Sequence, residues 1–350
     1  MESSEIFVPG RLCLFGEHSD WAGGHRRQNS EICPGYVVVA QTNQGNHARV
    51  ERLERSVLSF KSAVLKNSIE MPLDVDSLRK VAEGGGEFSY VAGVALDVVA
   101  NYNHCSSSGI GIDNYKTDLP IKKGLSSSAS ICVLAARAFS LVYDLKWTPR
   151  RVMEVAYIGE TNTPSRCGRM DQACAYSSPV LVKFDGDKMD VEELNVGEDV
   201  PISIADLKRG KNTRVILADL NRGFPFHSTD QERLKQDYLG PINYHLVSRA
   251  AQALRKGDLE RLGGLMSEAQ KGFDLYVAPA CPELNAPRLH EVLTCKELQE
   301  FVYGGKGVGS QGDGTAQFVC KSKEAREKAR EILEQKLGCE CLDLDLKKNV

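Results

Sequence analysis

Apolar and polar residues alternate along the first half of the chain in a way that predicts short strands and helices. Apolar residues at every second position are typical of strands, whereas apolar residues three or four positions apart are typical of helices. The pattern predicts strands at residues 6–15 (interrupted at Pro9-Gly10-Arg11), 35–40, 46–53, 109–112 and 180–184, with 46–53 as the partner of 35–40. It predicts helices at residues 88–102, from the serines near residue 126 onward, and at 153–161.

The second half mixes both kinds of element without a regular order. Residues 190–212 are polar and lack a clear period, so a boundary between two domains, residues 1–200 and 201–350, is expected there. Next come a predicted strand at 213–218, helices at 231–256 and 258–270, a glycine-rich loop at 304–314 between a helix ending near Tyr303 and a strand at 316–320, and a helix at 322–337. Because strands and helices do not alternate strictly, the expected fold class is α+β rather than a doubly wound sheet.

Bulk composition narrows the class of protein. With a formal net charge of −3 at pH 7, the chain has no electrostatic feature that favours nucleic acid or an anionic membrane as a partner. Its 11 cysteines lack the spacing of a zinc site or a disulfide framework, so free thiols in a reducing compartment are expected. Neither a signal peptide nor an apolar run of about 20 residues is evident. The composition therefore favours a cytoplasmic enzyme.

A glycine–serine segment at the start of a predicted helix suggests phosphate binding. The segment consists of Lys123, Gly124, Leu125, Ser126, Ser127, Ser128 and Ala129. A helix N-terminus offers unpaired N–H groups and a partial positive charge, which suit a polyphosphate, and a serine hydroxyl can reach a bound Mg²⁺. The alternative is an ordinary serine N-cap, and the loop G-x-x-x-x-G-K-[ST] is absent.

Three polar residues that follow the first predicted strand suggest a site for a polyol. Glu17, His18 and Asp20 form the pattern E-H-x-D. Two carboxylates and an imidazole at a strand end can hydrogen-bond several hydroxyls at once. A metal site fits less well, since the spacing is not that of one helix face and a third remote ligand is not apparent. A solvated polar loop is the remaining alternative.

Two further carboxylates and a second glycine-rich segment complete the set of candidates. Glu160 ends a predicted helix, and Asp171 follows Gly168 in an otherwise apolar neighbourhood. A carboxylate in such a place either accepts local hydrogen bonds or acts as a base or metal ligand. The glycine-rich loop at 304–314 could surround a ligand with its backbone, or it could be a flexible linker. Its candidate residues are Gly305, Gly307, Gly309, Ser310 and Gly312.

The order of these segments resembles that of the GHMP kinase family. P-G-R-x-x-L-x-G-E-H-x-D is followed by G-L-S-S-S-A-S, C-G-x-M-D-Q and a late glycine-rich loop, over the range from Pro9 to Val319. Within the family, the chain is most similar to the sugar-kinase branch around galactokinase. The resemblance implies an ATP-dependent phosphotransferase of α+β class. Its two domains would be a ribosomal-protein-S5-domain-2-like N-terminal domain and a ferredoxin-like C-terminal domain, with the active site in the cleft between them.

The resemblance also implies a role for each candidate residue. It places the phosphates of ATP on Gly124–Ala129, and Mg²⁺ on Ser128 and Glu160. Asp171 would take the proton of the acceptor hydroxyl, and Arg11 would keep that carboxylate ionised. The residues that would hold the sugar are Glu17, His18, Asp20 and Gly168. ATP and a monosaccharide are thus the expected partners, bound to a monomer or a homodimer.

Several arginines depart from the pattern of the family and leave the acceptor open. Arg26 and Arg27 lie in a long basic segment after E-H-x-D, while Arg166 and Arg169 precede Asp171. Arginine binds carboxylate and phosphate bidentately, which would suit a uronic acid or a sugar phosphate; otherwise these side chains point to solvent or to acidic neighbours. Beside a neutral-sugar 1-kinase, three hypotheses remain: a kinase for an anionic sugar, a mevalonate kinase and a non-catalytic sugar sensor.

Overall fold

The computed structural model describes residues 3–119, 125–165 and 167–349, and the chain divides into two compact units. Unit 1 contains Met1–Arg11 and Gln41–Ser177, and unit 2 contains Leu12–Ala40 and Ser178–Val350. Each unit therefore combines two separate stretches of chain. In the described residues, no helix combines the length and the apolar character that crossing a membrane requires.

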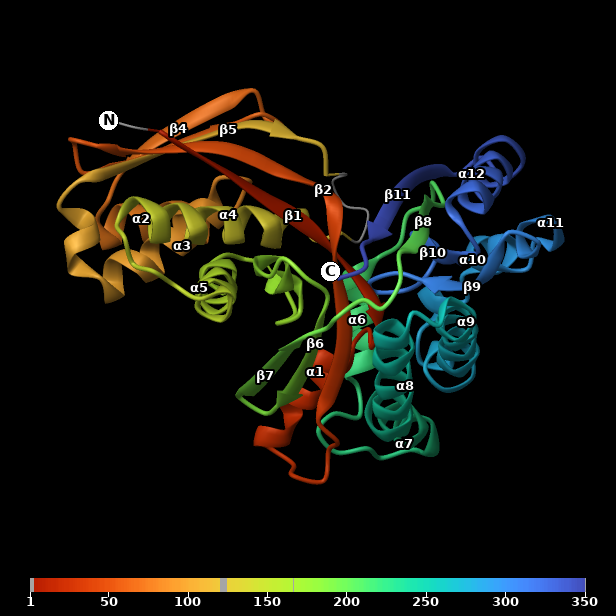
Figure 1. The fold of residues 1–350 in the computed structure, drawn as a ribbon. Helices are drawn as coiled ribbons and strands as arrows, with labels where there is room; N and C mark the ends of the chain where they lie inside the picture. Colours follow the sequence, from red (N-terminus) through yellow and green to blue (C-terminus); the bar gives the residue numbers. More distant parts are fainter. Residues whose placement is uncertain (1–2, 120–124, 166, 350) are drawn as a thin grey trace. The chain divides into compact units, whose positions relative to one another are not determined.

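Unit 1 is a sheet covered by helices on one face (Figure 1). Its strands pair in the order β4-β3-β5-β2, and β1 pairs with β2. The β3–β5 pair is parallel, whereas β3–β4 and β2–β5 are antiparallel. The elements that lie wholly or partly in this unit are β1 (Ser4–Phe15), β2 (Gly35–Leu53), β3 (Val57–Ser62), β4 (Asn67–Pro72), α2 (Val75–Gly84), α3 (Ser89–Asn101), β5 (Gly109–Thr117), α4 (Ser127–Val142), α5 (Pro149–Thr161) and the 3₁₀ turn η3 (Asp171–Ala175).

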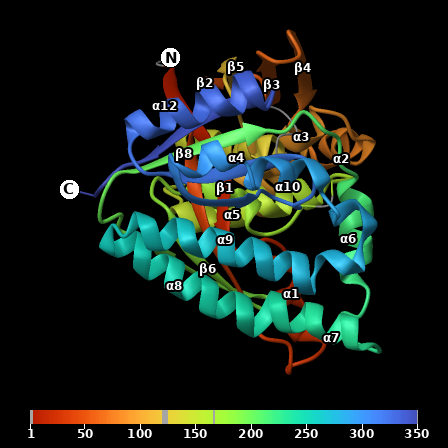
Figure 2. The same ribbon diagram turned by 90° about the vertical axis from the view of Figure 1, so that its right-hand side faces the viewer.

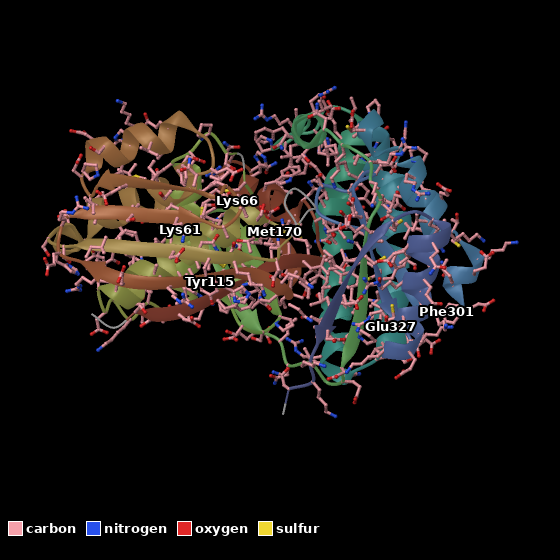
Figure 3. The ribbon with its side chains drawn as sticks, turned by 90° about the horizontal axis from the view of Figure 1, so that it is seen from above. Lys61, Lys66, Tyr115, Met170, Phe301 and Glu327 are labelled. Atoms are coloured by element: carbon pink, nitrogen blue, oxygen red, sulfur yellow. The ribbon has the colours of Figure 1, made fainter. Side chains whose placement is uncertain are left out.

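The two faces of this sheet have different surroundings. The helices α2, α3 and α4 cover one face, and α5 packs on α3 and α4. Most apolar side chains of α3 and α4 are buried, although Leu141 of α4 is 49% exposed. The other face carries Lys61 and Tyr115, which project from β3 and β5 (Figure 3). Lys61 pairs there with Asp113 at 3.5 Å, so this face is polar and open to solvent. The core of unit 1 therefore lies between the sheet and its helices.

Unit 2 contains a second sheet and several helices. Four strands pair antiparallel in the order β11-β8-β10-β9, and a hairpin of β6 and β7 pairs with the first residues of β2. The helices α8 and α9 run side by side (Figure 2). The elements are α1 (Ser19–Gly24), β6 (Val180–Asp185), β7 (Lys188–Glu193), β8 (Val200–Asp206), α6 (Thr213–Asn221), α7 (Asp230–Asp237), α8 (Asn243–Lys256), α9 (Leu259–Tyr276), α10 (Pro287–Leu293), α11 (Lys296–Gln299), β9 (Val302–Gly307), β10 (Thr315–Cys320), α12 (Lys323–Glu331) and β11 (Glu340–Leu346).

One hydrophobic cluster of unit 2 lies between its four-stranded sheet and the helices α10, α11 and α12. Phe318 of β10 is fully buried in it, together with Leu289, Leu298 and Leu333 from the helical segments. A buried glutamine adds a polar tie, because the Gln317 amide donates to the backbone carbonyl of Cys13 at 2.8 Å. This bond links β10 to the last residues of β1, just before the E-H-x-D residues.

Most of the predicted elements are present, but two strands are longer than expected. β1 continues through Pro9 without interruption, and residues 35–53 form the single strand β2 rather than two partners. Proline is tolerated in β1 because this strand pairs with β2 on one side, so its missing N–H donor is not needed on the other. The helices at 88–102, 153–161 and 322–337 are confirmed within a few residues at their ends, and the helix at 258–270 continues to Tyr276. The helical stretch expected at 231–256 is divided into α7 and α8 by a kink at Gly240.

The predicted strand at 213–218 is wrong, because these residues form the helix α6. The Asn212 side chain accepts a hydrogen bond from the N–H of Val215 and caps the helix. Ile216 and Leu220, four positions apart, are fully buried, while Val215 is 39% exposed. The apolar run therefore has helical rather than alternating burial.

Two other expectations about the second half also differ from the structure. Residues 302–307 form the strand β9, and the preceding helix α11 ends at Gln299, so no described helix ends near Tyr303. The polar stretch 190–212 contains the end of β7 and all of β8, whose residues are buried throughout. The sequence pattern also failed to indicate β3, β4, α2 and β11.

Candidate active site

The helix α4 begins at the serine segment, as the pattern predicted. Ser126 precedes the helix with a left-handed φ of 53°, and its side chain makes no capping hydrogen bond. The ordinary N-cap is therefore not what this serine forms. Ser127 and Ser128 are half-buried in the first turn, while Leu125 and Ala129 pack into the core. Lys123 and Gly124, which belong to the same predicted segment, lie outside the described residues.

A cavity of about 240 Å³ opens beside this helix start. Ser127 and Ser128 border it, and most of its remaining wall is apolar and aromatic. The other lining residues are Asn46, Phe60, Ser62, Val64, Leu65, Glu87, Phe88, Tyr90, Asn114, Thr117 and Ile131. An apolar cavity next to a helix N-terminus suits a flat aromatic base attached to phosphate groups.

Glu160 lies in the last turn of α5 and is fully buried, so its carboxylate depends on protein hydrogen bonds. The Gln172 amide donates to Oε2 at 2.8 Å, and the Ser165 hydroxyl donates to Oε1 at 3.2 Å. The Ser128 hydroxyl also lies close enough to this carboxylate to affect its pKa. Burial raises the pKa of Glu160, and the neighbouring charge of Asp171 raises it further, while Ser128, Gln172 and Ser165 lower it. The fold of unit 1 thus places Ser128 and Asp171 beside the Glu160 carboxylate.

Arg11 and Asp171 form an ion pair, although 160 positions separate them in the sequence. Nη2 and Nε of the arginine both donate to Oδ1 of the aspartate, at 2.6 and 3.2 Å. The arginine side chain is 6% exposed and the aspartate side chain 18%. Glycine at position 10 permits β1 to lie close to Leu119 and Leu125. A Cβ there would lie 2.4 Å from the Leu119 side chain and 3.0 Å from the Leu125 carbonyl oxygen. The backbone N–H of Arg11 donates to that carbonyl at 3.1 Å.

The oxygen donors around Glu160 match the preference of Mg²⁺. This ion takes hydroxyl, carboxylate and phosphate oxygens and commonly keeps few protein ligands. Ser128 and Glu160 supply one hydroxyl and one carboxylate, and the carboxylate is buried among neutral donors. In the described part of the chain, no group of three or more histidine, cysteine, aspartate or glutamate side chains could hold a metal without such help. The residues present therefore fit a magnesium ion that arrives with a nucleotide.

In unit 2, Glu17 of the E-H-x-D motif is bound by a lysine that the sequence pattern did not indicate. Lys306 on β9 forms an ion pair with Oε1 of Glu17, and both side chains are at most 5% exposed. The same ammonium donates to the Gly307 carbonyl at 2.9 Å. Because 289 positions separate the two residues, no local pattern could have paired them.

His18 and Asp20 lie beside Glu17 and are also buried. His18 precedes the helix α1 with a left-handed φ of 70°, and Asp20 lies in the first turn of that helix. The indole N–H of Trp21 donates to Nδ1 of His18 at 3.2 Å, and Phe273 stacks against the imidazole at 6.1 Å between ring centroids. Burial lowers the pKa of His18 to about 4; the charges of Lys211 and Lys306 also lower it, whereas the Ser310 carbonyl raises it. His18 is therefore neutral at physiological pH.

The late glycine-rich segment is held in place by hydrogen bonds rather than forming a linker. Gly305 and Gly307 belong to β9, whereas Gly309 and Gly312 have left-handed φ values of 66° and 74° in the loop that follows. The Lys211 ammonium donates to the carbonyls of Val308 and Gln311 at 3.2 and 2.6 Å, and Ser310 exchanges a 3.2 Å hydrogen bond with Thr213. Gly168, in unit 1, is half-buried in the loop before η3.

The arginines that suggested an anionic acceptor have other partners. Arg26 donates to Asp185 at 2.6 Å and to the carbonyls of Ser30 and Ile32. Arg27 pairs with Asp187 at the surface, at 3.4 Å. The guanidinium of Arg169 lies over the ring of Tyr157 at 5.4 Å, and Arg166 lies outside the described residues. Arg26 and Arg27 therefore contact acidic neighbours, as the alternative to binding an anionic substrate predicted.

The sequence and the fold are similar to those of known small-molecule kinases. The family profile of the GHMP kinases N terminal domain matches residues 89–178. The galactokinase of Thermotoga maritima is 25% identical over 353 residues, which cover 94% of this chain and 92% of that protein.

Solved structures extend the likeness to the whole fold. The galactokinase of Lactococcus lactis complexed with galactose has a TM-score of 0.74 at 18% identity, covering 99% of this chain and 94% of that chain. The mevalonate kinase of Methanococcus jannaschii also has a TM-score of 0.74, at 16% identity and 99% coverage of both chains. The α+β, two-domain fold that the order of the motifs implied is therefore confirmed.

Proposed function

We propose that this chain, whose residues 89–178 match the GHMP kinases N terminal domain, is an ATP-dependent sugar kinase of the galactokinase type, which phosphorylates the anomeric hydroxyl of a monosaccharide. The observation that carries the proposal is the cluster in unit 1 of Arg11, Asp171, Glu160 and the serine helix start. The relatives named galactokinase that cover most of this chain favour a sugar over mevalonate, for which the likeness is structural, at 16% identity.

Asp171 is the group that we assign to the proton of the acceptor hydroxyl. Arg11 occupies Oδ1 with two donors, so Oδ2 is the oxygen we assign to that proton. The acceptor oxygen then bonds to the γ-phosphorus, the bond from this phosphorus to the β,γ-bridging oxygen breaks, and ADP leaves. The guanidinium pairs with Asp171 before the transfer and stabilises negative charge on the phosphoryl group during it. A non-catalytic sensor would need neither the base nor its buried partner.

The nucleotide has a binding place within unit 1. The first turn of α4 presents N–H groups and the positive end of a 16-residue helix, which suit the phosphates. The adjoining cavity has the apolar and aromatic walls that suit adenine, and Asn46, Asn114 and Thr117 add polar atoms at its edge. Ser128 and Glu160 would hold Mg²⁺, which supplies positive charge next to the transferred phosphoryl group.

For the sugar, unit 2 offers a group of buried polar side chains. Glu17, His18 and Asp20 are each at most 6% exposed. The Glu17 charge is balanced by Lys306 and the imidazole is neutral, so the group as a whole suits hydroxyls better than a second anion. We therefore favour a neutral monosaccharide over a uronic acid or a sugar phosphate.

The test is an ADP-release assay with Mg-ATP against neutral hexoses, pentoses, uronic acids, heptose phosphates and mevalonate. We expect turnover with a neutral monosaccharide, and we expect Asp171→Asn to lower kcat by about 10³-fold while sugar binding is retained, because a general base contributes 10²–10⁴-fold. Turnover with mevalonate alone would contradict the sugar assignment, and full activity of the variant would contradict the role of Asp171.

Asp144→Asn is the matched control for this substitution. Asp144 lies in the same unit, its side chain is 81% exposed, and its left-handed φ of 53° is well tolerated by asparagine. Unchanged activity in this control would show that loss of turnover in Asp171→Asn is specific to the site.

A further inference from the structure

The contact between Trp21 and His18 decides which ring nitrogen of the histidine carries the proton. Nδ1 of His18 lies 3.2 Å from the indole nitrogen of Trp21. An indole N–H can only donate, so Nδ1 must accept and must be unprotonated. A neutral imidazole then carries its hydrogen on Nε2. Trp21 thus selects one of two tautomers that would otherwise compete.

The selected tautomer places a hydrogen-bond donor on a buried nitrogen, Nε2, for which the described residues provide no hydrogen-bonded acceptor. Nε2 of His18 is buried and makes no hydrogen bond within the described residues, although the Ser310 carbonyl lies close enough to affect the ring. Buried N–H groups without an acceptor are rare in proteins, and they commonly mark a place where a ligand supplies one. Stacking against Phe273 fixes the plane of the imidazole, so the direction of the N–H is set as well.

The ring of Trp21 is itself held by an aromatic cluster. It makes edge contacts with His25 and Phe224, at 6.2 and 5.2 Å between centroids, and His25 stacks on Phe224 at 5.3 Å. The Lys235 ammonium lies 6.0 Å from the centre of the Phe224 ring. These neighbours keep the indole oriented toward His18, so the tautomer is imposed by packing rather than by the ligand.

We infer that Trp21 is a positioning residue, whose indole N–H holds His18 as the Nε2–H tautomer so that His18 binds the acceptor sugar as a hydrogen-bond donor. This inference rests on the proposed function for the identity of the ligand. The sugar atom next to Nε2 of His18 is then an oxygen that accepts a hydrogen bond, such as the ring oxygen or a hydroxyl oxygen. A positively charged His18 imidazole would repel the indole N–H of Trp21, so His18 is neutral when the sugar is bound.

The first test is made on the free protein and does not depend on activity. In ¹⁵N-histidine-labelled wild-type protein, the resonances that disappear in His18→Gln are expected to show a protonated Nε2 and an unprotonated Nδ1 from pH 5 to 8. Trp21→Phe retains a ring but loses the donor, and we expect its His18 to show a mixture of both tautomers. A wild-type His18 with a protonated Nδ1, or a Trp21→Phe variant with the wild-type tautomer, would overturn the inference.

The second test uses whichever sugar gives turnover in the ADP-release assay. We expect Trp21→Phe to raise KM for that sugar about fivefold with kcat within about twofold, as loss of one neutral hydrogen bond predicts. A shifted tautomer with an unchanged KM would overturn the role toward the sugar. Trp147→Phe is the matched control, because Trp147 is the other of the two tryptophans and lies in unit 1.

Two readouts separate the possible causes of failure. Unchanged His25 resonances in Trp21→Phe show that the aromatic cluster keeps its packing, so that a tautomer change reflects the lost N–H alone. Absence of turnover by the wild-type protein with every sugar would count against the proposed function, while the tautomer measurement still decides the effect of Trp21 on His18.

Discussion

Two buried glutamates, Glu160 in unit 1 and Glu17 in unit 2, are stabilised in different ways. Glu160 accepts hydrogen bonds from Ser165 and Gln172, with the neutral Ser128 hydroxyl nearby, and its pKa is raised. Glu17 instead pairs with the Lys306 ammonium. A buried carboxylate among neutral donors gains when a cation arrives from solution, whereas one that is already paired offers only hydrogen-bond acceptors. The comparison thus supports the proposal of a metal in unit 1 and an uncharged ligand in unit 2.

The largest effect is expected from removing the cation beside Glu17. Lys306→Met leaves a buried, unpaired carboxylate and should lower the free energy of unfolding by about 3–5 kcal/mol, measured by urea denaturation. The double variant Glu17→Gln/Lys306→Met should recover most of this loss. Lys235→Met is the control, since Lys235 is equally buried but donates to the backbone carbonyls of Asp219 and Arg222. An equal loss in the control would show that the ion pair is not the cause.

The neutral state of His18 should make stability depend on pH. Its pKa is lowered from 6.5 to about 4, so between these values the unfolded chain binds more protons than the folded one. The free energy of unfolding should therefore fall as pH drops from about 6.5 to 4, and about 3 kcal/mol of that loss should come from His18. His18→Gln should have a correspondingly smaller pH dependence. An identical slope in both proteins would contradict a neutral, buried imidazole.

The substitution Glu160→Gln should reduce turnover without a large loss of stability. Removing the carboxylate is expected to lower kcat/KM for Mg-ATP about 10²-fold, because the metal loses a ligand while the buried charge disappears. Steady-state kinetics and thermal denaturation measure the two quantities. Glu154→Gln on the same helix is the control, since Glu154 pairs with Arg150 and Arg151 outside the cluster. Wild-type kinetics in Glu160→Gln would remove Glu160 from the site.

The smallest effect is expected from Mg²⁺ that arrives with a nucleotide. Mg-ADP at ten times its Kd should stabilise the wild-type protein by about 1.4 kcal/mol, since a ligand that binds only the folded state adds RT ln(1 + [L]/Kd). The part of this shift that depends on Mg²⁺ should vanish in Glu160→Gln and persist in Glu17→Gln. The opposite pattern in these two variants would reverse the assignment of metal and sugar to the two units.

The residues of unit 1 were easier to predict from the sequence than those of unit 2. The serine helix start, Glu160 and Asp171 stand in recognisable motifs, and the apolar spacing after Ser127 correctly placed the start of α4. Lys306 had no such signal, because its partner Glu17 is 289 positions away and the surrounding glycines read as a loop. Trp21 was missed for a different reason: its role depends on the orientation of one N–H toward His18, which only packing determines.

Errors in the fold have similar causes. Residues 213–218 contain adjacent apolar side chains that match a strand, and only the cap at Asn212 and the burial of Leu220 distinguish the helix. The long strand β2 is paired with β6 over its first residues and with β5 over its last. Its polar middle therefore looked like a turn between two strands. Strands that are far from β2 in the sequence therefore determine its length.

The strands β1 and β2 each begin in one unit and end in the other, which affects how the protein can fold during synthesis. Residues 12–40 leave the ribosome early, but the rest of their unit begins only at residue 178. At 5–20 residues per second, this segment must wait roughly 10–30 s for its partners, with the apolar side chains of Leu12, Leu14 and Phe15 not yet buried. Nascent chains paused before residue 178 are therefore the species most prone to aggregate, and no single cut in the chain can separate the two units.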